Sequence, residues 1–259
     1  MCAVRESPTL RHASVAQLRP IPGSVDLWST RLDDPRQQIQ AFWRLLSADE
    51  QSQAGRYRLQ LARDRFIVRR GVLRLILASY LGATPDQLRF TYGVNGKPAL
   101  DPEYHDKSPQ FNLSHSHGLA LYAITAGGEV GVDIERVRLD LRHSALVGRY
   151  FSPQETAEYQ LLPARLRVRA FFHGWTLKES YVKALGTGLA TPFNSFTVPM
   201  TPPTRYPVSG TQSPSAHLPP CWTLTKLALV PHYAVAITTA GPLNSIHHRW
   251  AWPLATDRG

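Results

Sequence analysis

Apolar positions recur with a helical period over one long stretch of the chain. Between residues 60 and 81 apolar residues recur at helical spacing, arginines fill the intervals, and Gly82 follows the last apolar residue. This pattern predicts a helix over 60–81 that ends at Gly82. Similar spacing predicts further helices over 35–46, 144–150, 153–161 and 165–185, and Ser152 is a suitable N-cap for the helix over 153–161.

Shorter runs of alternating apolar and polar residues, bounded by Gly, Pro and Asp, predict strands. They cover 25–28, 88–92, 110–113, 119–125 and 130–134, with a terminal hairpin over 222–230 and 232–239. Residues 199–220 contain seven prolines, so we expect an exposed loop there, and we place Trp250 and Trp252 in a tail. The order of elements predicts an α+β fold whose two halves meet near residues 126–129, with subdomains over 1–127 and 128–259.

The charge of the chain narrows the choice of partners. Its 259 residues carry a formal net charge of +10, and many of the arginines lie between residues 56 and 74. Such a balance predicts anionic partners: nucleic acid, a membrane surface, a phosphorylated small molecule or an acidic protein. No apolar run is long enough to span a bilayer, and Cys2 and Cys221 lack metal-binding spacing, so we expect a cytoplasmic, soluble protein with free thiols and no membrane partner.

Two carboxylates stand at alternate positions of one predicted strand. In the sequence Gly-Val-Asp-Ile-Glu over 131–135, Asp133 and Glu135 share a face while Val132 and Ile134 point the other way. Mg²⁺ prefers one or two carboxylates together with water and phosphate oxygens, so this pair is a candidate metal site. A solvated strand with an ordinary alternating pattern explains the same residues equally simply.

A second motif lies in the predicted helix over 165–185. Glu179 and Lys183 are four residues apart and therefore share a helix face. They form either an ordinary stabilising pair or a functional pair in which Glu179 completes the metal site and Lys183 binds a phosphate.

A third motif, Phe-Asn-Leu-Ser-His-Ser-His over 111–117, follows Gly96-Lys97-Pro98 along the chain. Ser114 and His115 are neighbours on a strand, so they point to opposite faces, and the chain has no G-x-S-x-G turn. A nucleophilic serine is therefore disfavoured. Hydroxyl, imidazole and backbone N–H groups at this place can instead surround a phosphate.

Along the chain the motifs are Gly-Lys-Pro over 96–98, Phe-Asn-Leu-Ser-His-Ser over 111–116, Gly-Val-Asp-Ile-Glu over 131–135 and Trp-Thr-Leu-Lys-Glu-Ser-Tyr-Val-Lys over 175–183. Together and in this order, these four stretches resemble the 4′-phosphopantetheinyl transferases, and Gly-Thr-Gly-Leu over 186–189 extends the resemblance. The match is to the large monomeric type that activates peptide and polyketide synthases and, in some organisms, fatty acid synthase. It covers roughly residues 50–196. The resemblance implies two similar α+β subdomains related by a pseudo-twofold axis, with coenzyme A as substrate and the metal bound at their interface. It also implies an acidic acyl or peptidyl carrier protein as partner, and a monomer.

Carried over to this chain, the resemblance makes Asp133, Glu135 and Glu179 the expected ligands of Mg²⁺ or Mn²⁺. The expected contacts to the nucleotide and pyrophosphate of coenzyme A are Gly96, Lys97, Pro98, Asn112, Ser114, His115 and Lys183. Family members often hold the 3′-phosphate with basic residues where this chain has Glu50 and Gln53. We therefore expect Arg56, Arg65 and Arg70 to share that task.

The chemistry implied by the resemblance is attack of the carrier's serine hydroxyl on the β-phosphorus of coenzyme A, with release of 3′,5′-ADP. Lys183 and His115 are expected to offset developing charge. Glu179 is the first candidate for the base, directly or through a water on the metal, and Glu155 is the alternative. Two rivals are a nucleic-acid-binding protein that uses the arginine-rich helix and a relative that binds carrier protein without catalysis; both leave the carboxylate set unexplained.

Overall fold

The structure is a computed structural model that describes residues 4–6, 17–33, 39–104, 109–139, 143–201, 205–209 and 221–252. Its helices are α1 (Ile39–Leu45), α2 (Ala48–Gly55), α3 (Gln60–Leu81), α4 (His143–Tyr150), α5 (Pro153–Leu161) and α6 (Ala164–Leu185). Its strands are β1 (Val4–Glu6), β2 (Ser24–Arg31), β3 (Phe90–Tyr92), β4 (Pro98–Leu100), β5 (Gln110–Ser116), β6 (Leu119–Thr125), β7 (Val130–Arg136), β8 (Arg205–Ser209), β9 (Cys221–Leu227), β10 (Tyr233–Ala240) and β11 (Ser245–Trp252).

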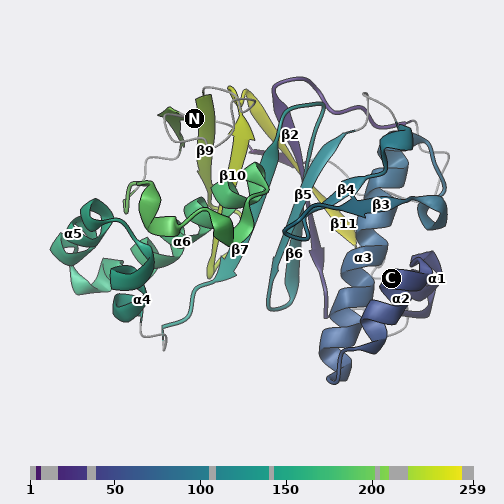
Figure 1. Cartoon of the computed structure of the whole chain (residues 1–259), viewed down its shortest axis with the longest axis horizontal. Helices are drawn as coiled ribbons and strands as arrows, with labels where there is room; N and C mark the ends of the chain where they lie inside the picture. Colours follow the sequence, from purple (N-terminus) through teal and green to yellow (C-terminus); the bar gives the residue numbers. More distant parts are fainter. Residues whose placement is uncertain are drawn as a thin grey trace, which may run out of the picture.

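Two sheets lie between the two longest helices (Figure 1). The first sheet has the strand order β1-β11-β2-β6-β5, the second has the order β7-β10-β9-β8, and β3 and β4 form a separate hairpin. One face of the first sheet, with Trp28 and Tyr122, packs against α3, and its other face, with Leu27 and Leu121, packs against the second sheet. Helix α6 covers the remaining face of the second sheet. Strand β6 is therefore buried on both faces.

The predicted α+β class is confirmed, and several elements occur where the sequence pattern placed them. Helices α3 and α5 and strand β6 begin and end at the predicted residues, and Gly82 ends α3 in the left-handed conformation, with φ of 64°. Ser152 caps α5 as predicted, since its hydroxyl accepts a hydrogen bond from the Glu155 N–H. Helix α1 is described from Ile39, so the predicted start at 35–38 lies outside the described residues.

A glycine allows the closest packing between a helix and a sheet in the second half. A Cβ atom on Gly131 would collide with the backbone of Ser180 and of Ala184, so only glycine lets α6 approach β7 this closely. Asp133 follows on the same strand, and Glu179 and Lys183 lie on the same stretch of helix. The glycine of the Gly-Val-Asp-Ile-Glu motif thus brings the carboxylates of two elements together.

Two predictions for the C-terminal third are wrong. The proline-rich segment holds strand β8, which pairs antiparallel with β9, although 202–204 and 210–220 lie outside the described residues. The expected tail forms strand β11, which pairs parallel with β2 in the first sheet. A division at residue 127 stays a prediction, but residues 245–252 lie in the same sheet as the N-terminal strands. Among the described residues, no helix is long and apolar enough to cross a membrane.

Candidate active site

A cleft of about 500 Å³ contains most of the residues that the motifs singled out. Its walls come from α3, the β3–β4 hairpin and β5 on one side, and from β7 and α6 on the other. Of the predicted site residues, the cleft is lined by Arg70, Gly96, Lys97, Pro98, Asn112, Ser114, His115, Asp133, Glu135, Glu179 and Lys183. The lining does not include Arg56, Arg65 or Glu155.

Asp133 has two oxygens in different environments. Its side chain is buried, and Oδ1 accepts hydrogen bonds from Lys183 Nζ at 2.6 Å and from Ser114 Oγ at 2.8 Å. The second oxygen, Oδ2, is also buried, yet it has no hydrogen-bond partner within the described ranges. A buried carboxylate oxygen without a partner is energetically costly, and a bound cation removes that cost.

Glu135 and Glu179 stand beside this aspartate. Burial and the charge of Asp133 raise the pKa of Glu135 above its ordinary value, and burial with the charges of Asp133 and Glu135 raises the pKa of Glu179. Three carboxylates that repel one another at the bottom of a cleft form a local excess of negative charge. A divalent cation or a proton relieves it.

The donor set fits Mg²⁺ in its chemistry. Asp133 Oδ2 lacks a partner, and all three carboxylates are hard oxygen donors. In the part of the chain that the structure describes, however, no three His, Cys, Asp or Glu side chains are placed so that they alone could hold a metal ion. Mg²⁺ sites in proteins commonly consist of a few carboxylates completed by water and phosphate oxygens.

The residues predicted to contact coenzyme A have partners of their own. Ser114 Oγ donates to Asp133 and accepts from Lys183 Nζ at 2.9 Å, and Lys97 Nζ lies 2.7 Å from Glu129 Oε2 and 3.2 Å from the carbonyl oxygen of Ala184. His115 lies on the opposite face of β5 from Ser114, as the strand pattern predicts. Burial of its ring, together with neighbouring positive charges, lowers the pKa of His115 to about 4.

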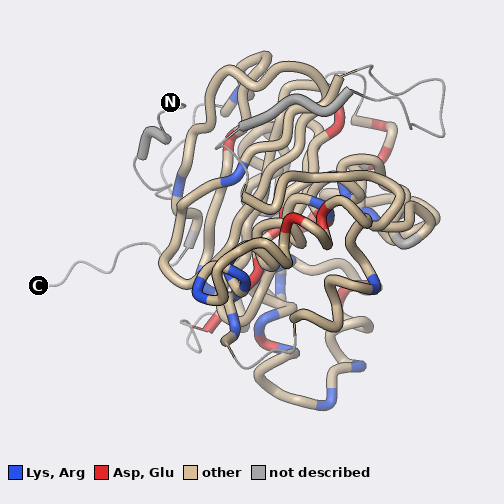
Figure 2. The backbone as a smooth tube through the Cα atoms, turned by 90° about the vertical axis from the view of Figure 1, so that its left-hand side faces the viewer, with Lys and Arg blue, Asp and Glu red and all other residues tan. Residues whose placement is uncertain are grey.

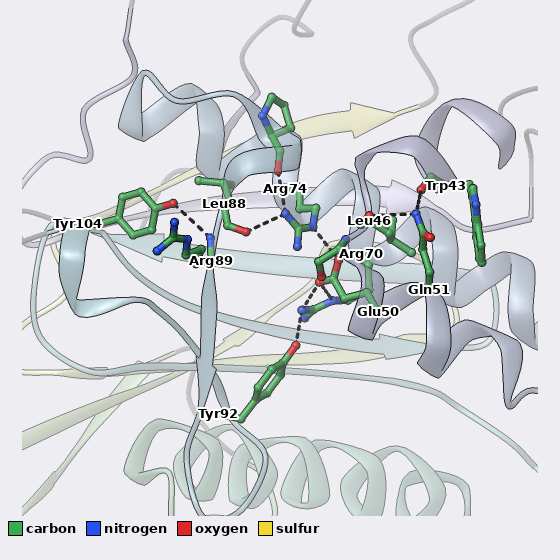
Figure 3. Close-up of polar contacts among 12 residues, drawn as sticks. Trp43, Leu46, Glu50, Gln51, Arg70, Arg74, Leu88, Arg89, Tyr92 and Tyr104 are labelled. Atoms are coloured by element: carbon green, nitrogen blue, oxygen red, sulfur yellow. Dashed lines mark hydrogen bonds and ion pairs between the residues drawn. The ribbon is translucent and has the colours of Figure 1, made fainter.

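Arg70 lines the cleft, but its guanidinium is already held by other side chains (Figure 3). Glu50, which is fully buried in α2, accepts hydrogen bonds from Arg70 Nε and from Arg74 Nε, each at 2.7 Å. Arg70 also donates to the Tyr92 hydroxyl at 2.7 Å, and Arg74 donates to the carbonyl oxygen of Leu88 at 2.9 Å. These two arginines hold α2, α3 and the β3 segment together, so they are not a surface that could follow a nucleic-acid backbone.

The structure does not bring Arg56, Arg65 and Glu155 into the cleft. Arg56 is exposed at the end of α2, and Arg65 forms a two-point ion pair with Asp33, at 2.6 and 3.0 Å. Glu155 is fully buried with Lys178, 2.8 Å away. It also accepts a hydrogen bond from the Val198 N–H at 2.6 Å, so its role is to fix α5 and the segment after α6. Glu155, the alternative candidate for the base, is therefore too deeply buried to reach a substrate.

Sequence reasoning missed Arg69, the basic residue of α3 that reaches the cleft without a carboxylate partner among the described side chains. Its guanidinium lies 5.4 Å from the centroid of the Phe66 ring, which also lines the cleft. Phe66, Arg69 and Arg70 occupy positions i, i+3 and i+4, so they share one face of α3. That spacing was visible in the sequence, but only the ion pairs of Arg65 and Arg70 show which arginine remains available.

Comparisons with known proteins agree with this geometry. The family model for the 4′-phosphopantetheinyl transferase superfamily matches residues 129–238, and the model for the N-terminal part of 4′-phosphopantetheinyl transferases matches 32–128. The chain is 36% identical to the 4′-phosphopantetheinyl transferase HetI of Nostoc sp. strain PCC 7120 over 217 residues, which is 84% of this chain and 88% of the relative. It is 30% identical to the 4′-phosphopantetheinyl transferase psf-1 of Bacillus pumilus, over 83% of this chain and 89% of the relative. The chain therefore belongs to the 4′-phosphopantetheinyl transferase superfamily.

Proposed function

We propose that the chain moves the phosphopantetheine arm of coenzyme A onto a serine of an acidic acyl or peptidyl carrier protein, with Mg²⁺ held at Asp133, Glu135 and Glu179. Transfer of phosphopantetheine to carrier proteins is the activity of the superfamily. The observation that supports the metal is Asp133, whose Oδ2 is buried and unpartnered beside two further carboxylates. Mn²⁺ has the same preference for hard oxygen donors and is the expected substitute.

When bound, the cation would neutralise charge on the pyrophosphate of coenzyme A. Two side chains of the cleft act on the same phosphates. Lys183 Nζ, partly exposed beside Asp133, places a positive charge next to the reacting phosphate. The neutral imidazole of His115 offers a hydrogen-bond donor from the opposite face of β5.

The transfer needs a base for the carrier's serine. As the serine oxygen forms its bond to the β-phosphorus, the bond to the bridging oxygen breaks and 3′,5′-ADP leaves. The serine proton would go to Glu179, whose carboxylate lines the cleft beside Asp133. With Glu155 buried in its own ion pair, Glu179 is the remaining candidate of the two glutamates predicted from the sequence.

The nucleotide end of coenzyme A is proposed to lie against α3. Arg69 and Phe66 line that wall together with Gln53 and Tyr92. Burial lowers the pKa of the Arg69 guanidinium, but an arginine remains charged at neutral pH. Because Arg65 is paired with Asp33 and Arg70 is held by Glu50 and Tyr92, Arg69 is the arginine we assign to the 3′-phosphate.

The carrier protein is proposed to approach the end of the cleft at Glu135. Figure 2 shows lysine and arginine positions spread along the backbone. Burial, followed by the positive charges of Arg136, Arg138 and Arg65, lowers the pKa of His117, while Asp33 acts in the opposite direction. We call Arg136 and Arg138, which neighbour His117, the basic rim. A basic rim speeds encounter with an acidic partner, and this steering weakens as salt rises.

Mass spectrometry of an apo carrier protein tests the proposal. Incubation with the chain, coenzyme A and Mg²⁺ is expected to raise the carrier's mass by one phosphopantetheine arm, and chelation of divalent cations is expected to abolish the change. The rate is expected to fall with added salt, and to fall less steeply in Arg136→Ala/Arg138→Ala. No mass change on peptidyl and acyl carriers alike would contradict the enzymatic function, and an unchanged rate after chelation would contradict the metal.

A further inference from the structure

Strands β5 and β7 are the edge strands of the two sheets, and they are joined by side chains. Strand β5 pairs along its backbone with β6, and β7 pairs with β10. Between β5 and β7, polar side chains at every second position of β5 take the place of backbone carbonyl groups. The pairs are Asn112 Oδ1 with the Val132 N–H at 2.9 Å, Ser114 Oγ with the Ile134 N–H at 3.4 Å, and Ser116 Oγ with the Arg136 N–H at 3.1 Å.

Each of the two serines in this row also contacts a carboxylate. Ser114 Oγ donates to Asp133 Oδ1 at 2.8 Å, and Ser116 Oγ donates to Glu135 Oε2, also at 2.8 Å. A serine hydroxyl has one hydrogen to donate and two lone pairs to accept with. Each serine therefore accepts from a β7 N–H and uses its hydrogen on the carboxylate of the preceding β7 residue.

From this geometry we infer that Ser116 is a positioning residue, which holds the Glu135 carboxylate toward the cleft from the opposite half of the molecule. The inference rests on the proposed function, because it gives a task to a residue beside the proposed metal site. Ser116 is itself buried, so its hydroxyl has little freedom to turn elsewhere once it accepts from Arg136 N–H.

Glu135 depends on Ser116 for its orientation more than Asp133 depends on Ser114. Asp133 keeps its ion pair with Lys183, at 2.6 Å, when the Ser114 hydroxyl is removed. Glu135 has no ion pair within the described segments, and Ser116 is its hydrogen-bond donor there. Asp133 repels Glu135, while Lys183 and Arg138 attract it from a longer range, and its side chain is only partly buried. The hydrogen bond from Ser116 is therefore the short-range contact that fixes its direction.

The experiment measures metal binding in the absence of carrier protein. Binding of Mn²⁺ to the whole chain is followed by electron paramagnetic resonance in Ser116→Ala and in Ser116→Thr, which keeps the hydroxyl. Removal of a group that orients a metal ligand lowers metal affinity by about 10- to 100-fold, so we expect this loss in Ser116→Ala and its recovery in Ser116→Thr. In transfer assays, the Mg²⁺ concentration for half-maximal rate is expected to rise while the rate at saturating Mg²⁺ stays close to wild type.

Ser29→Ala is the matched control. Ser29 is equally buried in the first sheet, but its hydroxyl contacts His248 at 2.7 Å, so this substitution is expected to leave Mn²⁺ affinity unchanged. If Ser116→Ala does not fold, Ser116→Cys replaces it, since a thiol keeps the volume but donates weakly. A folded variant without the hydroxyl that binds Mn²⁺ as wild type does would overturn the inference.

A double substitution separates positioning from general damage to the fold. In a Glu135→Gln background the carboxylate is already gone, so Ser116→Ala is expected to cause no further loss of Mn²⁺ affinity. A full additional loss there would show that Ser116 acts through the fold and not through Glu135. If wild-type protein transfers the arm but binds no Mn²⁺, the metal site of the proposed function fails as well, a result distinct from failure of Ser116 alone.

Discussion

Lys183 Nζ lies 2.6 Å from Asp133 Oδ1, and Ser114 donates a hydrogen bond to this same oxygen. The fold thereby fixes one oxygen of Asp133 and leaves Oδ2 buried without a hydrogen-bond partner in the described residues. Lys183 comes from α6, Ser114 from β5 and Asp133 from β7, so three elements from both halves determine how this carboxylate is turned.

Asp133→Asn is expected to lower the rate of phosphopantetheine transfer by about 100-fold or more, because the variant loses both a charged oxygen in the cleft and the attraction to Lys183. The measurement is the initial rate of mass increase of an apo carrier protein at saturating coenzyme A. Asp33→Asn is the control, since Asp33 is a half-exposed partner of Arg65 outside the cleft lining. Equal rates for the two variants would contradict the role given to Asp133.

Arg69→Ala is expected to raise the KM for coenzyme A by about 10- to 100-fold, the range for loss of a hydrogen bond to a charged group. Steady-state kinetics with 3′-dephospho-coenzyme A supply the test of the contact, because the substitution should have little effect on a substrate that lacks the 3′-phosphate. Arg65→Ala is the matched control, since Arg65 is bound to Asp33. A larger effect in Arg65→Ala than in Arg69→Ala would restore the assignment made from the sequence.

Glu50→Gln is expected to lower the free energy of unfolding by about 3–5 kcal/mol, because it leaves the buried charges of Arg70 and Arg74 without a carboxylate. Urea denaturation measures the change. Glu103→Gln breaks a pair with Arg89 in which both side chains are about two-thirds exposed, so little change is expected there. Similar losses in the two variants would show that burial is not what makes the Glu50 cluster important.

The elements that could be predicted from the sequence are those whose signals lie within one short segment of the chain. Helix α3 has a periodic apolar face and a glycine stop within one segment, and the Asp133 and Glu135 pattern is contained in five residues. Strand β11 was missed because its partner β2 lies about 220 residues earlier, and nothing near Trp250 indicates a parallel neighbour. Strand β8 was missed because it contains Pro207 and lies in a proline-rich segment, so only its pairing with β9 identifies it as a strand.

The candidate site shows the same division. The order of the motifs along the sequence was sufficient to predict that Ser114, Asp133, Glu179 and Lys183 lie in one cleft. The choice among the arginines was not available from the sequence, because it depends on a carboxylate of another helix, Glu50, and on ion pairs that form only in the folded chain.

His115 gives the protein a predictable response to acid. Its pKa is lowered to about 4 from an ordinary value of 6.5, mainly by burial and then by Arg69, Lys183 and Arg65. Between these two values the unfolded chain binds a proton that the folded chain does not, so stability falls as the pH falls from 6.5 toward 4.

Urea denaturation at pH 7.5 and pH 5 checks this expectation. His115→Gln removes the titrating group, so the variant is expected to lose less stability than wild type between the two pH values. An NMR titration of the His115 ring is expected to show a midpoint well below 6.5. A midpoint at the ordinary value, with equal acid sensitivity of the two proteins, would contradict the prediction.

Strand β11 lies between β1 and β2, so the sheet that supports α3 includes a strand from the far end of the sequence. During synthesis, β2, β5, β6 and α3 leave the ribosome long before residues 245–252 do. Until then one edge of β2 has no neighbour, and unpaired edges of this kind invite association with other chains. The N-terminal half is therefore synthesised first, but its sheet is completed only when β11 is added at the end. A fragment ending at residue 127 would keep the edge of β2 unpaired.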